Sequence, residues 1–184
     1  MNIVYLGGKQ AGVIGLLTVL AHDDNVVAVV AYDDIVKKFA YSCINLGHWL
    51  SCYSSIHDIK SWKGIDLIVS VHGREIVSDD ILKLAKYGGI NVHPCLSNFK
   101  GMNPIKRFLV SDKYPHASVG VHRMTSKVDE GETLKEIFVE VDGCHTEVEV
   151  YNALYPTYTE VLLYVLEMPK GILKKFDDCY RSGY

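Results

Sequence analysis

One segment decides the fold: Ile65-Asp-Leu-Ile-Val-Ser-Val71. A short, almost continuous apolar run of this kind is typical of a strand buried on both faces of a parallel sheet. The motif Ser78-Asp-Asp80 follows and predicts the cap of a helix that runs to about residue 86. Gly88-Gly89 ends this helix, and residues 90–92 predict another short strand.

The first part of the chain follows the same alternation. We expect a strand at 2–6, a helix at 11–21, a strand at 26–31, a helix capped by Asp33-Asp34 and running to about 46, and a strand at 49–53. This alternation predicts an α/β fold: an open, mostly parallel, Rossmann-like sheet with helices on both faces. In such sheets, ligands bind at the carboxyl ends of the strands.

The second part of the chain has a different pattern. Residues 117–124 and 134–141 read as strands with no clear helix between them, so we expect an antiparallel pair. From about 145 to 168 the pattern is helical, and Pro156 is expected to break it. Within it, the apolar run 161–166 predicts core packing, with a homodimer face as the alternative. We expect residues 1–184 to form a single domain.

Charge and composition exclude several classes of protein. The 184 residues carry 19 Lys and Arg against 22 Asp and Glu, a formal net charge of -3. A nucleic-acid binder would show a basic excess, so we expect no nucleic-acid partner. No run of 18 apolar residues predicts a membrane span, and no signal peptide is evident.

The cysteines indicate a reducing compartment. They are odd in number and form no C-x-x-C pair, so we expect free thiols and a cytoplasmic location. They are Cys43, Cys52, Cys95, Cys144 and Cys179. The spacing of Cys43 and Cys52 from His48 and His57 matches no common zinc site, so no metal is expected.

The glycine-rich start, with Gly7, Gly8, Gly12 and Gly15, leaves two readings open. Backbone amides at the start of a helix bind phosphate, but the pattern fits neither G-x-G-x-x-G nor a P-loop. A tight strand-to-helix turn that needs glycine is the reading that we favour. Lys9 lies in this turn and meets either a phosphate or solvent.

The most informative stretch is Ile90-Asn-Val-His-Pro-Cys-Leu-Ser-Asn-Phe-Lys-Gly101. Asn91 and His93 lie two residues apart, hence on one face of a short strand, before Pro94 turns the chain into a loop. An oxyanion that develops during a reaction needs a neutral hydrogen-bond donor and a group that can be protonated, and an amide beside an imidazole provides both. Asp129 precedes Gly131, where a turn could bring its carboxylate to His93. A nucleophilic pair of His93 with Cys95 is the weaker alternative.

These motifs resemble those of the folate-dependent formyltransferases. The resemblance rests on N-x-H-P-x-L at 91–96, K-G at 100–101, G-V-x-x-M at 120–124 and D-x-G at 129–131. It implies transfer of a formyl group from 10-formyltetrahydrofolate to an amine. Asn91, His93 and Asp129 would be catalytic: Asn91 and a protonated His93 would stabilise the oxyanion, and Asp129 would hold His93 charged and relay a proton.

The same resemblance implies two binding regions. The pterin of the donor would contact the loop after the buried strand and the loop wall at 125–131, in particular His72, Gly73, Arg74, Ile76, Val77 and Val128. The acceptor would contact Gly8, Lys9, Arg74 and Lys100. Arg74 either contacts the acceptor or pairs with Asp79 or Asp80.

One departure concerns the loop at 95–101. The usual Leu-Leu-Pro of the family is replaced by Leu96-Ser97-Asn98, and the loop is one residue shorter. This change puts the geometry of the site, and with it activity, in question. It supports a second hypothesis, a non-catalytic homologue that binds folate or a nucleotide. A third, an unrelated nucleotide-binding domain such as a dehydrogenase, rests only on the glycine pattern.

The acceptor is expected to be a small phosphorylated amine. The segments Arg74 to Leu82 and His122-Arg-Met124 resemble the enzymes that formylate nucleotide-linked amino sugars. Glycinamide ribonucleotide is the alternative acceptor. The pattern does not identify the amine itself, because acceptor pockets are built from variable loops. It also leaves the oligomeric state open, with a homodimer as a candidate.

Overall fold

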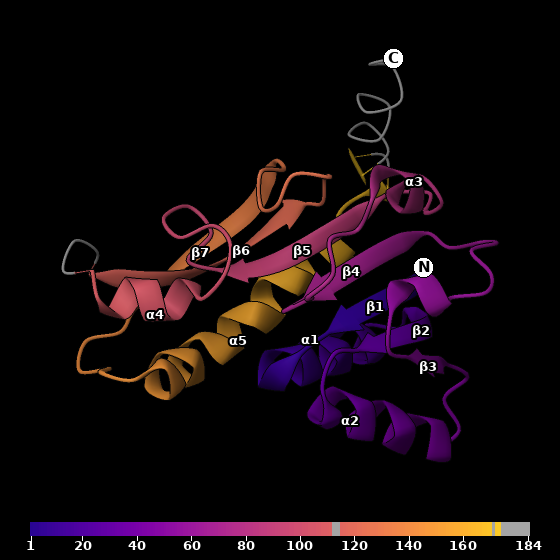
Figure 1. The fold of residues 1–184 in the computed structure, drawn as a ribbon, viewed down its shortest axis with the longest axis horizontal. Coiled ribbons are helices and arrows are strands. Elements are labelled where there is room, and N and C mark those ends of the chain that lie inside the picture. The colour runs from indigo at the N-terminus through magenta and orange to yellow at the C-terminus, as the bar shows by residue number, and fades with distance from the viewer. Residues whose placement is uncertain (112–114, 171, 174–184) are drawn as a thin grey trace.

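The computed structural model describes residues 1–111, 115–170 and 172–173, and a seven-stranded sheet forms its centre (Figure 1). The strands are β1 (Asn2–Gly7), β2 (Asn25–Ala31), β3 (Ser51–Tyr53), β4 (Leu67–Val71), β5 (Gly89–Pro94), β6 (His116–Arg123) and β7 (Thr133–Glu140). Their order is β3-β2-β1-β4-β5-β6-β7. The first five are parallel, while β6 is antiparallel to β5 and to β7.

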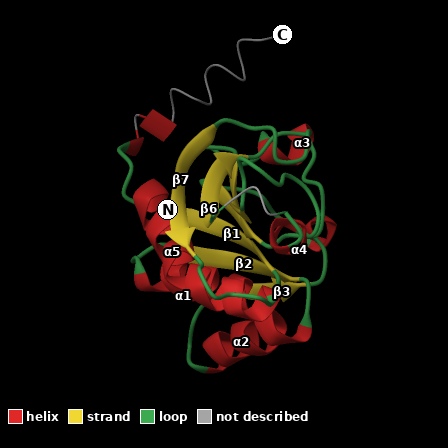
Figure 2. Ribbon diagram, turned by 90° about the vertical axis from the view of Figure 1, so that its left-hand side faces the viewer, coloured by secondary structure: helices red, strands yellow, loops and turns green. Residues whose placement is uncertain are grey.

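The helices cover both faces of this sheet (Figure 2). They are α1 (Lys9–Ala21), α2 (Asp34–Asn45), the 3-10 helix η1 (Ile56–Asp58), α3 (Asp79–Leu82), α4 (Pro104–Leu109) and α5 (Glu147–Leu166). Alternate residues of β1 face opposite layers: Ile3 and Tyr5 join the core under α1 and α5, and Val4 and Leu6 join the core under η1 and α3. The predicted α/β fold is confirmed, with only short helices on the second face.

Helix α3 is shorter than the sequence indicates. Ser78 caps it as predicted, accepting a hydrogen bond from the backbone N–H of Ile81. However, the amides of Lys86 and Tyr87 donate to the carbonyls of Ile65 and Asp66 at 3.0 and 2.7 Å. These bonds take the chain out of the helix and align it beside β4, ready to enter β5.

Helix α5 corrects the expectation of a break at Pro156, because it is continuous from Glu147 to Leu166. Proline inside a helix costs about 3 kcal/mol through the lost hydrogen bond and a steric clash. Pro156 lies on the exposed face, while Leu154, Tyr158 and Val161 are fully buried on the other face. Burial of that face offsets the local cost.

The run 161–166 packs in the core as expected: Val161, Leu162 and Val165 are fully buried. The short helix α4 was not predicted. Four cysteines, Cys43, Cys52, Cys95 and Cys144, are free thiols, and Cys179 lies outside the described residues. No helix within the described ranges has the length and apolar character to cross a membrane.

Candidate active site

A cavity of about 620 Å³ opens at the carboxyl ends of β4 and β5. A volume of this size suits a small-molecule ligand. Its wall includes ten residues that the sequence placed in a site: Lys9, His72, Gly73, Arg74, Ile76, Val77, Asn91, His93, Val128 and Asp129. Gly8 and Lys100 are not part of this wall.

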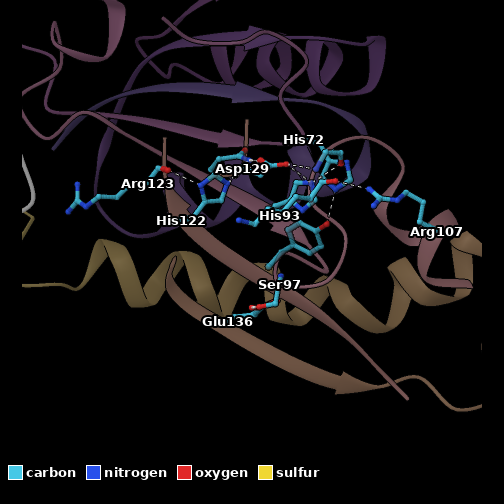
Figure 3. Close-up of polar contacts among 12 residues, drawn as sticks. His72, His93, Ser97, Arg107, His122, Arg123, Asp129 and Glu136 are labelled. Atoms are coloured by element: carbon cyan, nitrogen blue, oxygen red, sulfur yellow. Dashed lines mark hydrogen bonds and ion pairs between the residues drawn. The ribbon is translucent and has the colours of Figure 1, made fainter. Parts of the chain in front are cut away.

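The three predicted catalytic side chains meet at one point of the wall, and Figure 3 shows His93 and Asp129 there. β5 presents Asn91 and His93 on the same face, and the loop between β6 and β7 brings Asp129 over them. Nε2 of His93 lies 3.1 Å from Oδ2 of Asp129, and Nδ2 of Asn91 donates to Oδ1 of Asp129 at 3.3 Å. Asp129 thus collects one donor from each of the two β5 residues.

A fourth side chain, His122 of β6, belongs to this cluster and was not predicted as a site residue. Its Nδ1 donates to the carbonyl of Arg123 at 2.7 Å. Its Nε2 lies 3.3 Å from Oδ1 of Asp129 and 3.2 Å from Nδ2 of Asn91. The cross-strand pairing of Asn91 with His122 places the two side chains together. The sequence alone does not give the register of β5 and β6, and His122 could not be assigned to the site without it.

The electrostatics of the cluster favour an ionised Asp129. Burial alone would raise the pKa of Asp129, but His122, His93 and the backbone N–H of Gly101 together lower it to about 2. Burial lowers the pKa of His93, and the Asp129 charge opposes this only in part. Both partners of His93 Nε2, the Asp129 carboxylate and the Gly101 carbonyl at 3.0 Å, are acceptors, so this nitrogen carries the proton.

The loop at 95–101 closes on the cluster. The backbone N–H of Gly101 donates to Oδ2 of Asp129 at 2.8 Å, while its carbonyl faces His93. Gly101 adopts a φ of 83°, which favours glycine. From α4, Arg107 donates to the carbonyl of Lys100 at 2.6 Å (Figure 3). Lys100 thus contributes its backbone to the loop, and its side chain is exposed.

Unusual backbone conformations gather around the cavity. Lys9, His72, Asn103 and Asp129 all line it, and all have positive φ values of 52° to 58°. Such non-glycine residues each cost on the order of 1–3 kcal/mol, and they concentrate at functional sites. The clustering supports a functional assignment for this cavity.

The loop after β4 is tied to the rest of the fold by Glu75. Its carboxylate accepts hydrogen bonds from Tyr32 Oη at 2.8 Å, Ser55 Oγ at 2.5 Å and the N–H of Ile56 at 2.9 Å. This anchorage leaves Ile76 65% exposed at the cavity, opposite the exposed Val128. The loop therefore offers an apolar surface at the rim.

His72 begins the same loop and is held in its neutral form. Burial, with smaller contributions from the Lys9 and His93 charges, lowers the pKa of His72 to about 3. Its Nε2 lies 2.7 Å from the hydroxyl of Tyr158. The ring of Tyr151 packs 5.4 Å from the His72 ring, and Lys9 Nζ lies 5.8 Å from the centre of Tyr151.

Arg74 pairs differently from the sequence prediction. Its guanidinium lies 3.5 Å from Oδ2 of Asp33, whose carboxylate also accepts the N–H of Lys9 at 2.5 Å. Asp79 instead accepts the N–H of Ser126 at 3.2 Å. Of the two alternatives for Arg74, the pairing with Asp79 or Asp80 is therefore wrong, and Arg74 stays beside Lys9 at the cavity.

The alternative of a nucleophilic pair of His93 with Cys95 loses its basis. Cys95 is buried, and burial raises the pKa of its thiol to about 11, which does not suit a nucleophile. Gly15 packs tightly, because an added Cβ would lie 2.5 Å from the Tyr5 hydroxyl and 2.8 Å from Val71. Gly15 lies inside α1, so its glycine serves the packing of this helix against β1 and β4. In the part of the chain that the structure describes, no three potential metal ligands come together.

Comparisons with known proteins agree with this geometry. A family model described as formyl transferase matches residues 53–166. The bifunctional polymyxin resistance protein ArnA of Wigglesworthia glossinidia brevipalpis is 27% identical over 174 residues. The match covers 84% of this chain and 25% of ArnA, so the chain spans a quarter of the length of this curated relative.

Two solved structures show the same fold. Glycinamide ribonucleotide transformylase 1 from Symbiobacterium toebii superposes with a TM-score of 0.71 at 17% identity, over 88% of this chain and 83% of that one. WlaRD, a sugar 3N-formyl transferase whose structure was determined in the presence of dTDP and 5-N-formyl-THF, gives a TM-score of 0.65 at 17% identity. That match covers 89% of this chain and 61% of WlaRD.

Proposed function

Since the chain belongs to the formyl transferase family, we propose that it transfers a formyl group from 10-formyltetrahydrofolate to a primary amine of a small phosphorylated acceptor. A nucleotide-linked amino sugar is the acceptor that we favour, and glycinamide ribonucleotide is the alternative. Family membership replaces the reading of an unrelated nucleotide-binding domain. The observation that carries the proposal is the meeting of Asn91 and His93 donors on the Asp129 carboxylate in the cavity wall.

This arrangement suits acyl transfer to an amine. Asn91 has a second amide hydrogen, and a protonated His93 would add an N–H at Nδ1, which has no hydrogen-bond partner among the described residues. Both residues line the space where a formyl oxygen would gain negative charge. Donors that are already oriented cost little reorganisation when that charge develops. We assign to these two residues the stabilisation of the oxyanion.

Asp129 would act in proton transfer and in orientation. As an ionised group beside His93, it favours the protonated form of the His93 imidazole. The attacking amine must lose a proton, and the departing folate nitrogen must gain one. A carboxylate with two imidazole neighbours can hold that proton between the two events.

The cavity suits a folate-type donor at one end. Ile76 and Val128 provide apolar surface, and the anchored loop at 73–77 presents its backbone. The donor would supply the activated formyl group, while these residues would hold its ring system beside His93.

The positively charged part of the cavity wall suits an anionic acceptor. Lys9 and Arg74 bring two positive charges to the wall, and Tyr151 adds an aromatic face beside Lys9. A cation and an aromatic ring together suit the phosphate and the planar or sugar group of a nucleotide-linked compound. This pairing favours the amino sugar nucleotide.

The test has two stages. Calorimetric titration with a non-hydrolysable analogue of 10-formyltetrahydrofolate is expected to give a micromolar Kd. Incubation with 10-formyltetrahydrofolate and a panel of nucleotide-linked amino sugars and glycinamide ribonucleotide is then followed by mass spectrometry. We expect one acceptor to gain a single CO unit while tetrahydrofolate forms. Donor binding without product from any acceptor would support the non-catalytic homologue, and no binding would overturn both readings.

A further inference from the structure

Glu136 lies outside the cavity wall yet makes an unusual set of contacts with the loop that closes it. From the edge strand β7, its Oε1 accepts the backbone N–H of Ser97 at 3.1 Å and the hydroxyl of Ser118 at 2.6 Å. Its Oε2 accepts the Ser97 hydroxyl (Figure 3). One carboxylate thus satisfies three donors from the loop and from β6.

Ser97 belongs to a turn that is seated on the sheet. Cys95 begins the turn with a φ of 53°, and its N–H donates to the carbonyl of Ser118 at 2.8 Å. Leu96 packs on Gly120, where an added Cβ would lie 2.6 Å from Leu96 Cδ2. Gly120 is the cross-strand partner of Glu136. The turn therefore rests on β6 and is tied to β7 by Glu136.

The other end of the same loop touches the candidate catalytic residues. The N–H of Gly101 donates to Asp129 at 2.8 Å, and its carbonyl accepts from Nε2 of His93 at 3.0 Å. Only Asn98, Phe99 and Lys100 separate Ser97 from this contact. A shift of the turn is therefore transmitted directly to His93 and Asp129.

We propose that Glu136 is a positioning residue, whose carboxylate clamps the loop at 95–101 so that Gly101 holds His93 and Asp129 in register. This inference rests on the proposed function in one respect: it predicts an effect on formyl transfer. The clamp consists of Glu136, Ser97 and Ser118.

The clamp requires a side chain whose two terminal atoms can both form hydrogen bonds. Ser97 supplies two donors and Ser118 a third, and a carboxylate accepts all of them at once. In Glu136→Gln, the amide oxygen can still accept from the Ser97 N–H and Ser118, and its NH₂ can donate to the Ser97 hydroxyl. In Glu136→Ala, every one of these bonds is lost. The conservative variant therefore separates loss of the clamp from loss of charge.

The kinetic test compares Glu136→Ala and Glu136→Gln with Glu140→Ala, a matched control at an exposed position on the same strand. For Glu136→Ala we expect kcat to fall about ten- to hundredfold, as for a small misplacement of reacting groups, with the KM for 10-formyltetrahydrofolate unchanged. Glu136→Gln should restore most of kcat. Equal kcat in Glu136→Ala and in Glu140→Ala, with an active wild type, would overturn the proposal.

A second measurement does not depend on the reaction. NMR follows the titration of the His93 ring and the hydrogen exchange of the Gly101 amide in the same variants. The His93 ring faces Asp129, His122 and His72, none of which is substituted. Loss of the Gly101 carbonyl contact, which raises the pKa of His93, should lower that pKa further in Glu136→Ala, and the amide should exchange faster.

The two failures can be told apart. If the wild type transfers no formyl group but Glu136→Ala changes the His93 titration and the Gly101 exchange, the proposed function fails and the clamp stands. If both NMR signals are unchanged in a folded Glu136→Ala protein, the clamp is wrong whatever the activity. Ser97→Ala, which removes only the hydroxyl bond, should give a smaller change in the same direction, and it replaces Glu136→Ala if that variant does not fold.

Discussion

Nε2 of His93 and Oδ2 of Asp129 lie 3.1 Å apart, although one belongs to a strand and the other to a loop at the far end of the next hairpin. The Asp129 backbone has a φ of 52°, a conformation that Asp and Asn tolerate better than most residues. The fold therefore accepts local strain to place this carboxylate on His93. Several measurable consequences depend on this pair.

Asp129→Asn should remove most of the activity and leave the fold in place. Asn has the same size as Asp and also tolerates positive φ. However, it lacks the negative charge that the Asp129 carboxylate presents to the two imidazoles. We expect kcat to fall by roughly 10² to 10⁴, the usual contribution of acid–base groups. Single-turnover kinetics with 10-formyltetrahydrofolate measures this, and far-UV circular dichroism checks the fold. A variant with wild-type kcat would show that Asp129 does not act in the reaction.

His72 should make the protein sensitive to acid. Its folded pKa of about 3 lies below the unfolded value of about 6.5, so the unfolded chain binds the proton first as pH falls. The stability contribution is fully present above pH of about 6.5 and is lost progressively toward about 3. His72→Asn tolerates the positive φ and should flatten this dependence. Urea denaturation at pH 7 and pH 5 compares the two proteins, and equal slopes against pH would contradict the assignment.

Gly131 should be intolerant of any side chain. An added Cβ would lie 1.8 Å from the carbonyl oxygen of Arg123, a backbone atom that cannot move aside cheaply. Gly131→Ala should therefore displace the loop that carries Asp129, lowering both the melting temperature and kcat. Gly143→Ala is the control, because its Cβ would meet nothing within 4 Å and only the φ of 79° is unfavourable. Similar losses in the two variants would refute the steric argument.

Lys9 should act in acceptor binding and not in donor binding. Lys9→Gln keeps an unbranched side chain at the positive φ and removes the charge beside Tyr151. We expect the acceptor KM to rise roughly tenfold, about 1.4 kcal/mol, and to lose part of its salt dependence. The KM for 10-formyltetrahydrofolate should stay constant. Lys37→Gln, on the exposed face of α2, is the charge-matched control. A rise in the donor KM instead would place Lys9 in the other subsite.

The sequence predicts what depends on local pattern. The cap at Asp33, the cap at Ser78 and the alternation of strands and helices need only neighbouring residues, and the structure has them. Asn91 and His93 share a face because a strand has a period of two. Asn91 and His93 meet Asp129 because the chain turns after β6. The position of Asp129 shortly before Gly131 indicated such a turn.

What the sequence missed depends on register and on long-range burial. His122 and Glu136 join their clusters only through the pairing of β6 with β5 and β7. Arg74 meets Asp33 because β1, β2 and β4 are neighbours in the sheet and their carboxyl ends lie together. A search for acidic residues close to Arg74 in the sequence does not find Asp33. Pro156 stays inside a continuous helix because tertiary packing outweighs its local preference.

The most direct test of the central claim follows the formyl carbon itself. Wild type and His93→Asn are each incubated with 10-formyltetrahydrofolate labelled in the formyl group and with the amino sugar nucleotide panel, and the label is followed by mass spectrometry. The account predicts labelled N-formyl product and free tetrahydrofolate from the wild type, and neither from a correctly folded His93→Asn. Product at equal rates from both proteins, or label released only as formate, would contradict it.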